Sequence, residues 1–261
     1  RAPGPIRHGG RIDFVWDEAF TRRIAAFAGA SGTSTYGTLL AAFKTWLHAE
    51  SRAADIPVWY CNANRSDRRL AALVGWVEKM SLDRFPLDTA ESFAGLLRRQ
   101  AASLQDALTR QLVAHHAIEA MDRKPDSPAR GAITGALDQF EFTMRRPESV
   151  EDMGFATLFH RPGSRLNLVG IEVESVSMPN DGCDRDIVVY VQDYEGEICG
   201  EFRYNADVFD RSTAQRMLDR YRRCVELAIE HPAWTLTEIA EALPPAPARA
   251  PVAISATEQV S

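Results

Sequence analysis

The chain has 261 residues, of which 45% are hydrophobic and 25% charged, the balance of an ordinary soluble globular protein. Thirty Lys and Arg against 36 Asp and Glu give a formal net charge of -6, which argues against a generally basic nucleic-acid binder. No apolar run approaches the ~20 residues of a membrane-spanning helix, and no signal-peptide pattern opens the chain. We therefore expect a cytoplasmic protein of mixed α and β structure that binds neither nucleic acid nor membranes.

The first part of the chain predicts alternating strands and helices. Apolar residues at every second position indicate a strand over 12–16. Asp17 is a suitable N-cap for a helix that ends near Gly29, and a second helix runs to about Glu50. The core-facing residues of that second helix are expected to be Leu39, Leu40, Phe43, Trp46 and Leu47. A strand over 57–61 and a short helix over 68–73 complete this part.

The second part predicts a long helical region and then a hairpin. Residues 90–122 keep a helical period, 136–144 alternate as a strand, and 166–176 fit either a strand or a buried loop. The clearest hairpin joins 187–191 to 198–204 around Glu195-Gly196. An amphipathic helix over 212–230 and a last helix capped by Thr235 and ending at Ala242 follow. Strands and helices in this order favour a mixed sheet packed with helices.

We divide the chain into three segments. Residues 1–11 are expected to be a flexible N-terminal segment, 12–242 the folded domain, and 243–261 a Pro/Ala-rich linker or tail. The chain begins at Arg1 without a methionine, so both a fragment of a longer protein and a free-standing half remain open.

Cysteine and histidine patterns do not complete a catalytic or metal site. The four cysteines form no C-x-x-C pair, so reduced thiols are expected and no metal site is predicted. His115-His116 would be adjacent on a helix and would face different ways. Compared with the acyltransferase motif HHxxxDG, Ala120 and Met121 replace its Asp and Gly. We therefore assign no catalytic residue to this chain.

Four segments in order resemble the C-terminal half of a nonribosomal peptide synthetase condensation domain. They are Thr33-Ser34-Thr35 with Leu39-Leu40-Ala41-Ala42-Phe43; Asn62-Ala63-Asn64-Arg65 with Val74-Gly75-Trp76-Val77; Ala117-Ile118-Glu119; and Gly200 to Asp210, which is similar to G-x-x-x-Y-N-x-D-x-F-D. The resemblance spans roughly 12–242 and depends on the order and spacing of the segments.

The resemblance implies a lobe with a fold like chloramphenicol acetyltransferase, a mixed β-sheet packed with helices. An N-terminal lobe carrying HHxxxDG would supply catalysis, and the two lobes would join acyl or aminoacyl groups by amide bond formation. The implied partners are that lobe, peptidyl or acyl carrier proteins bearing phosphopantetheine arms, and neighbouring synthetase domains. No cofactor is expected to bind this chain directly, and the chain alone is not expected to be catalytic.

The resemblance also implies roles for individual residues. Arg65 matches the Arg that pairs with the Asp of HHxxxDG across the lobes, and a guanidinium can hold a carboxylate bidentately. A surface Arg at a strand end is the alternative. The residues assigned to the tunnel or acceptor side are Asn64, Gly75, Trp76, Lys79 and Gln139.

Departures from the family pattern keep two further functions open. Lys79-Met80 stands where the family has Asn-Thr, and Ala117-Ile118 where it has Pro-Phe. These changes favour a catalytically inactive interaction domain that recruits a tailoring enzyme or a carrier protein. A related carrier-dependent acyltransferase that forms an ester is the third possibility. An intact HHxxxDG motif upstream would favour amide or ester formation, and a broken motif would favour the interaction domain.

Overall fold

The computed structural model describes residues 8–62, 73–75, 77–109, 139–145, 165–168, 170–174, 176, 182–183, 185–194 and 196–246. Its centre is a six-stranded sheet in the order β1-β8-β7-β4-β2-β3. In that order the strands are β1 (Gly9–Trp16), β8 (Glu197–Asn205), β7 (Ile187–Tyr194), β4 (Phe140–Arg145), β2 (Val58–Asn62) and β3 (Lys79–Asp83). Strands β4 and β7 pair in parallel, as do β2 and β4, whereas the other neighbours are antiparallel. The predicted mixed sheet is confirmed.

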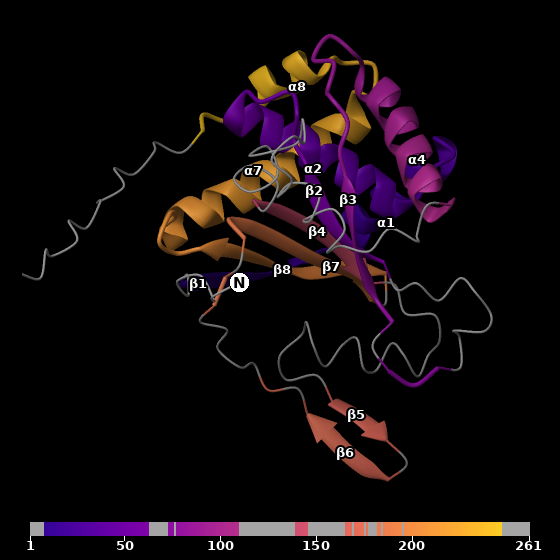
Figure 1. Cartoon of the computed structure of the whole chain (residues 1–261), viewed down its shortest axis with the longest axis vertical. Helices are drawn as coiled ribbons and strands as arrows, with labels where there is room; N and C mark the ends of the chain where they lie inside the picture. The colour runs from indigo at the N-terminus through magenta and orange to yellow at the C-terminus, as the bar shows by residue number, and fades with distance from the viewer. Residues whose placement is uncertain are drawn as a thin grey trace, which may run out of the picture.

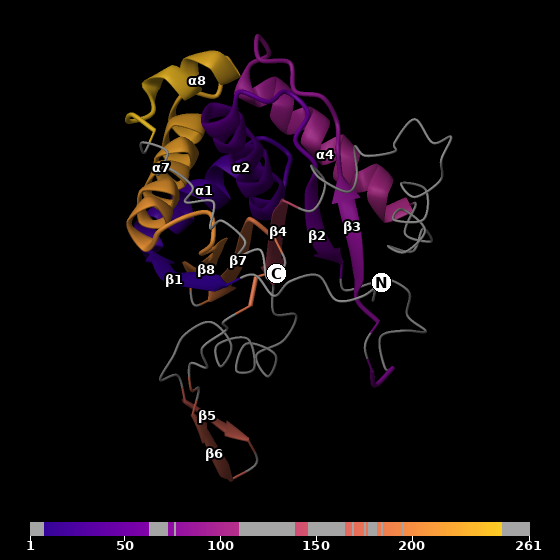
Figure 2. The ribbon, with the colours of Figure 1, turned by 60° about the vertical axis from the view of Figure 1, so that its left-hand side comes forward.

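The described helices cover one face of this sheet (Figures 1 and 2). They are α1 (Glu18–Ala30), α2 (Thr35–Ser51), α4 (Phe93–Thr109), α7 (Arg211–Glu230) and α8 (Leu236–Ala242). A separate hairpin of β5 (Arg165–Leu168) and β6 (Ile171–Glu174) lies apart from the sheet in both views. No helix in the described ranges is long and apolar enough to cross a membrane.

Side-chain caps explain where the helices begin. The Asp17 carboxylate accepts from the Phe20 backbone N–H at 2.9 Å, which confirms it as the N-cap of α1. Ser34 caps α2 by accepting from the Gly37 N–H at 3.0 Å. Thr235 forms a capping box with Glu238 at the start of α8. The starts of α1 and α8, predicted from Asp17 and Thr235, follow from this local chemistry.

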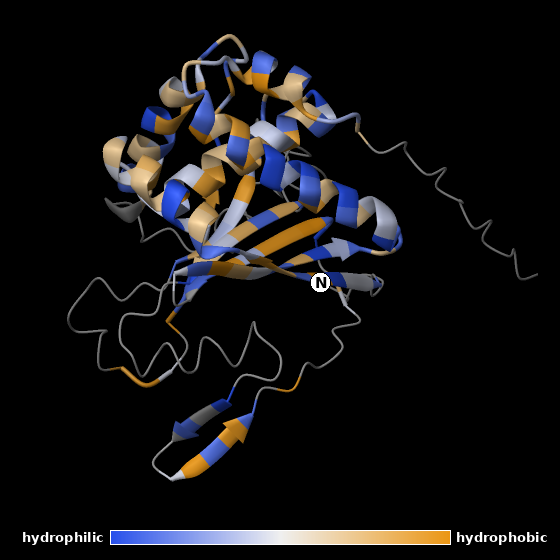
Figure 3. Ribbon diagram, turned by 180° about the vertical axis from the view of Figure 1, so that it is seen from behind, coloured by the Kyte–Doolittle hydropathy of each residue, from blue (hydrophilic) through white to orange (hydrophobic). Residues whose placement is uncertain are grey.

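The core lies between the helices and the sheet and is rich in aromatic rings. Phe43 of α2 packs 5.2 Å from Phe142 of β4 and 5.6 Å from Tyr221 of α7, between ring centroids. The buried Tyr221 hydroxyl donates to the Leu39 carbonyl at 3.1 Å, and burial raises the pKa of this phenol well above its usual value. Figure 3 shows apolar residues on the strands below the helices, and apolar and polar residues alternating along the helices.

One expectation about the elements needs correction, and one strand was not foreseen. Strand β1 begins at Gly9, so residues 9–11 belong to the sheet instead of the flexible segment. Strand β3 was not predicted, because its sequence Lys-Met-Ser-Leu-Asp has charges at both ends. Of the two possibilities left open for 166–176, the strand is confirmed, because β5 and β6 cover 165–168 and 171–174 and Ile171 is 67% exposed.

Candidate functional site

One end of the sheet brings together two of the segments that the sequence singled out. Asn62, the last residue of β2, is paired with Lys79, the first residue of β3. In the sequence, Asn64 and Arg65 come two and three residues after Asn62. Gly75 precedes β3 in an exposed segment with a φ of 144°, a conformation that favours glycine. Gly75 therefore lies on the chain that leads into the edge strand β3, and Lys79 is the first residue of that strand.

Gln139 lies at the other end of the sheet. It immediately precedes β4, and its carbonyl accepts from the Ile187 N–H at 3.0 Å. Because β4 runs parallel to β2 with Trp59 opposite Glu141, the start of β4 is remote from the end of β2 that carries Asn62. Gln139 is level with position 57, just before the neighbouring strand β2 and five residues from Asn62, which at about 3.3 Å per residue is about 17 Å. The structure does not bring Gln139 next to Lys79.

Several predicted positions lie outside the described residues. They are Asn64, Arg65, Trp76, His115, His116 and Glu119. The roles of Asn64, Arg65 and Trp76 therefore stay predictions from the resemblance.

A buried ionic cluster that the sequence reasoning missed lies beneath β3. The Lys44 ammonium of α2 is fully buried, and its Nζ lies 2.5 Å from Oδ2 of the buried Asp83. Asp83 also accepts from Gln100 Nε2 at 2.9 Å and from Ser103 Oγ at 2.6 Å, both on α4. The Phe85 ring centroid lies 3.8 Å from the same ammonium. A lysine in the middle of the apolar run of α2 was the available signal.

Burial and charge act in opposite directions on Lys44. Burial lowers the pKa of its ammonium, while the Asp83 carboxylate raises it. Breaking such a pair leaves an uncompensated buried charge, which usually costs about 3–5 kcal/mol. The cluster therefore ties α2, α4 and the edge strand β3 together.

The sheet face away from the helices carries further buried ion pairs. Arg185 Nε donates to Glu141 Oε2 at 3.0 Å, and the Arg185 guanidinium lies 5.5 Å from the Trp59 ring. Glu201, which is 1% exposed, is held by Arg11 at 3.2 Å and by Arg203 at 2.6 Å. Sequence reasoning missed these pairs because hydrophobic periodicity does not report which charges meet. A polar, charge-paired layer here is unlike the aromatic core on the helix side.

The described cysteines, and the histidines His8 and His231, are buried or make structural contacts. Burial, reinforced by the charge of Glu78, raises the pKa of the Cys61 thiol to about 12, so the thiol is a poor nucleophile at neutral pH. All four cysteines are free, and three are buried, as the prediction of reduced thiols requires. His8 pairs with Asp207 at 2.8 Å, and His231 stacks on Trp234 at 4.0 Å. Among the described residues, no cluster of three metal-ligating side chains occurs.

The segment with the strongest resemblance, Gly200 to Asp210, holds the sheet to α7. Asn205 Nδ2 donates to Asp186 Oδ1 at 3.2 Å, and Asn205 Oδ1 accepts from the Asp207 N–H at 3.0 Å. Asp210 caps α7 by accepting from the Thr213 N–H at 2.7 Å. Tyr204 packs so closely on Gly10 that a Cβ there would lie 2.1 Å from the ring. The motif therefore has a structural role.

Several solved structures share this fold. A four-domain nonribosomal peptide synthetase, holo-AB3403, superposes with a TM-score of 0.77 at 18% identity over 89% of this chain and 18% of that chain. The X-domain from teicoplanin biosynthesis gives 0.70 at 19% identity, covering 91% of this chain and 51% of that one. The first condensation domain of the CDA synthetase gives 0.67 at 18% identity, covering 94% and 49%. The expected chloramphenicol acetyltransferase-like lobe is confirmed.

The condensation domain family model matches residues 2–245, so the chain belongs to the condensation domain family. It is 25% identical over 232 residues to chondramide synthase cmdD of Chondromyces crocatus, covering 88% of this chain and 5% of that protein. It is 24% identical over 209 residues to malpinin synthetase of Mortierella alpina, covering 80% and 2%. The chain thus spans a small part of these relatives and about half of the X-domain and the CDA synthetase condensation domain.

Proposed function

We propose that this chain is the C-terminal half of a condensation domain in nonribosomal peptide synthesis. With an N-terminal lobe carrying HHxxxDG, it would join carrier-bound acyl or aminoacyl groups as amides. The observation that carries the proposal is the family match over residues 2–245, together with coverage of about half of the solved condensation domain. The partners would be the N-terminal lobe, carrier proteins with their phosphopantetheine arms, and neighbouring synthetase domains, all in the cytoplasm.

In the proposed reaction, the acceptor amine attacks the carbonyl carbon of a carrier-bound thioester. A C–N bond forms, the C–S bond breaks, and the amine proton ends on the released thiol. A thioester is already activated, so positioning and proton transfer supply much of the rate. The HHxxxDG lobe would supply the histidine, and this chain would shape the acceptor side through Gly75 and Lys79. Gln139 would act at the other end of the sheet.

Arg65 would support that site from this chain. A guanidinium paired with the Asp of HHxxxDG would hold the loop that bears the catalytic histidine. Support comes from the sequence, in which Arg65 comes three residues after Asn62, the residue of β2 that pairs with Lys79. Arg65 would then be a positioning residue.

The test combines this chain with a condensation N-terminal lobe, in one polypeptide or as two. Carriers loaded with an aminoacyl donor and an aminoacyl acceptor are mixed with the protein, and the amide product is measured by mass spectrometry. We expect product from the two-lobe protein and none from the 261-residue chain alone. Absence of product, with an N-terminal lobe that is active beside its own C-terminal half, would contradict amide synthesis.

Arg65→Ala in the two-lobe protein tests the inter-lobe pair. We expect kcat to fall at least about tenfold, with partial rescue by Arg65→Lys, because a lysine keeps the charge and loses the bidentate geometry. Arg22→Ala is the matched control, since Arg22 is 73% exposed and pairs with its helix neighbour Glu18. Equal rates for the Arg65→Ala and Arg22→Ala proteins would rule out the pair.

A second candidate function is an inactive interaction domain. The X-domain from teicoplanin biosynthesis shares this fold, and another solved structure is a complex of that X-domain with OxyB. The Lys79-Met80 departure points in the same direction. In the same assay this function predicts no product but measurable binding of a carrier or a tailoring enzyme. An acceptor carrying a hydroxyl in place of the amine separates ester formation from amide formation.

A further inference from the structure

The edge strand β3 turns its polar residues toward the helices and its apolar residues away from them. Asp83 points to the helices, and alternation along the strand puts Lys79 and Ser81 on that same face. Met80 and Leu82 therefore face the opposite side, where they lie across from Cys61 and Trp59. A strand normally turns its apolar residues toward the packed helices, and a slip of one residue exchanges the two faces.

The edge position leaves the register of β3 weakly determined by the sheet. Within the described sheet, β3 pairs with β2 alone. Its residues Lys79 to Leu82 are only half-buried, and Asp83 is the one fully buried residue of the strand. Hydrophobic burial thus distinguishes the two faces poorly, and another interaction must select the register.

We propose that the buried Lys44–Asp83 pair locks the register of β3. In the native register Asp83 lies opposite Val58 and meets the Lys44 ammonium at 2.5 Å. A slip in one direction would bring Leu82 to this place and leave a buried ammonium without its counter-charge. A slip in the other direction would bring Arg84, a second cation, against Lys44.

Two donors on α4 make the lock specific for a carboxylate at position 83. Gln100 and Ser103 both donate to the Asp83 oxygens, at 2.9 and 2.6 Å. Neither Leu82 nor Arg84 could accept these hydrogen bonds. Burial of Lys44, Asp83 and Gln100 removes water as a substitute partner.

The lock decides which side chain, Lys79 or Met80, faces the helix side at the start of β3. This consequence rests on the proposed function, in which Lys79 belongs to the acceptor side. Lys44 and Asp83 are then positioning residues for the acceptor site, acting through the register of β3.

Native Cys61 gives a direct test, because it lies opposite Met80. Directly paired antiparallel residues have Cα atoms about 4.5–5.5 Å apart, within the range of a disulfide. Met80→Cys, Lys79→Cys and Ser81→Cys are each made in the full chain and oxidised with copper phenanthroline. The disulfide to Cys61 is quantified by peptide mapping, with the unmodified chain as the baseline.

In the native background we expect Met80→Cys to cross-link at least ~10-fold more than the other two variants. The background Lys44→Met/Asp83→Leu replaces the ion pair by apolar side chains, an exchange that folded proteins often tolerate. There we expect the Met80→Cys yield to fall and the Lys79→Cys or Ser81→Cys yield to come within about twofold of it.

An unchanged cross-linking pattern in the Lys44→Met/Asp83→Leu background would overturn the proposal. If that background fails to fold, Lys44→Met/Asp83→Asn is used instead. It also removes both charges, and it is easier to fold because the asparagine oxygen can still accept from Gln100 or Ser103. The same cross-linking yields are measured. Unchanged yields in the folded Asn variant would equally overturn it.

The two-lobe protein adds a functional readout. With the register lock removed, we expect KM for the acceptor-loaded carrier to rise about tenfold, with kcat and donor KM little changed. An unchanged acceptor KM in a slipped variant would remove the positioning role and leave the lock. If the parent two-lobe protein makes no product, the proposed function fails, while the cross-linking still decides the lock.

Discussion

At the scale of single residues, Cys61 is partly exposed, yet its thiol is a poor nucleophile. Cys61 is half-buried on β2, and its backbone N–H donates to Thr143 Oγ1 at 3.1 Å. Burial and the nearby Glu78 carboxylate favour the neutral thiol, which raises the pKa of Cys61 to about 12. The sequence offered no sign of this, since the environment comes from β3 and β4.

We predict that Cys61 resists alkylation at neutral pH. At pH 8 only about one thiol in 10,000 is ionised when the pKa is near 12, and the thiolate is the reactive species. Iodoacetamide and peptide mapping should find Cys61 unmodified at pH 8, with a rate that grows about tenfold per pH unit up to about pH 10. Gln215→Cys, on the exposed side of α7, is the control thiol. Equal rates at both thiols at pH 8 would contradict the raised pKa.

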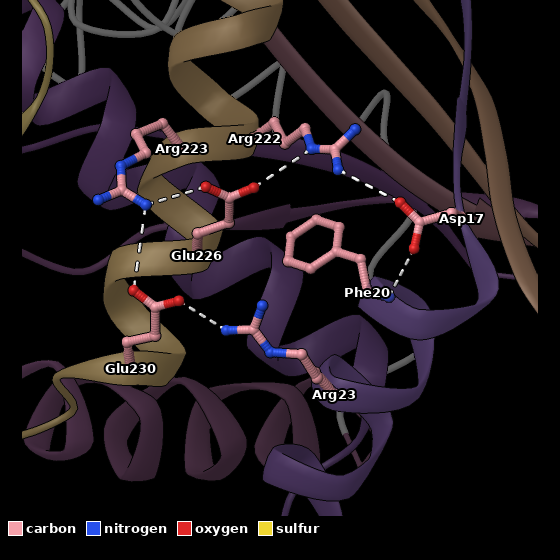
Figure 4. A network of polar contacts seen from close by, with 7 residues as sticks. All are labelled: Asp17, Phe20, Arg23, Arg222, Arg223, Glu226 and Glu230. Atoms are coloured by element: carbon pink, nitrogen blue, oxygen red, sulfur yellow. Dashed lines mark hydrogen bonds and ion pairs between the residues drawn. The ribbon is translucent and has the colours of Figure 1, made fainter.

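At the scale of elements, caps and periodicity predicted the helices, whereas their packing depends on contacts between distant residues. Figure 4 shows such a contact between α1 and α7. Arg222 Nη2 lies 3.5 Å from Asp17, Arg23 lies 2.6 Å from Glu230, and Glu226 holds both Arg222 and Arg223 at 3.3 and 3.0 Å. These groups are partly exposed, so solvent screens their attraction.

We predict that Glu226→Gln lowers the stability of the folded chain only slightly. The free energy of unfolding, from urea titration, should fall by less than about 1 kcal/mol at low salt. In about 1 M NaCl the Debye length is about 3 Å, so the difference from the parent should shrink toward zero. Glu241→Gln, at an exposed position of α8, makes the same change in net charge outside this network and serves as the control. A loss above about 2 kcal/mol that persists in salt would show that the network is not screened.

At the scale of the whole molecule, stability resides in the layer between helices and sheet. Phe142 is fully buried there among Phe43, Tyr36 and Tyr221. The β5–β6 hairpin instead lies apart from the sheet (Figures 1 and 2), and a two-stranded hairpin alone is marginally stable.

We predict that the β5–β6 hairpin contributes little to the stability of the fold and that the aromatic core contributes a great deal. Replacing 165–174 by a Gly/Ser linker should change Tm by less than about 2 °C, whereas Phe142→Ala should cost about 3–5 kcal/mol. Both are measured by thermal and urea unfolding followed by circular dichroism. A large loss of Tm in the linker variant would mean that the hairpin belongs to the cooperative core.

Sequence alone determined the elements whose signals are local and the family to which they belong. The Asp17 and Thr235 caps, the hairpin at Gly196 and the stripe of α7 each depend on residues a few positions apart. Resemblance in the order of segments sufficed for the fold class, because the family match covers 2–245.

Tertiary structure alone decided the edge strand, the buried ion pairs and the division of the proposed site. Lys44 meets Asp83, and Glu141 meets Arg185, across 39 and 44 residues of chain, and neither pair has a local pattern. Gln139 is separated from Lys79 because β2 and β4 are parallel, so the start of β4 and the end of β2 lie at opposite ends of the strands. A buried charge is stable only beside a partner that folding brings to it, and hydrophobic periodicity carries no information about that partner.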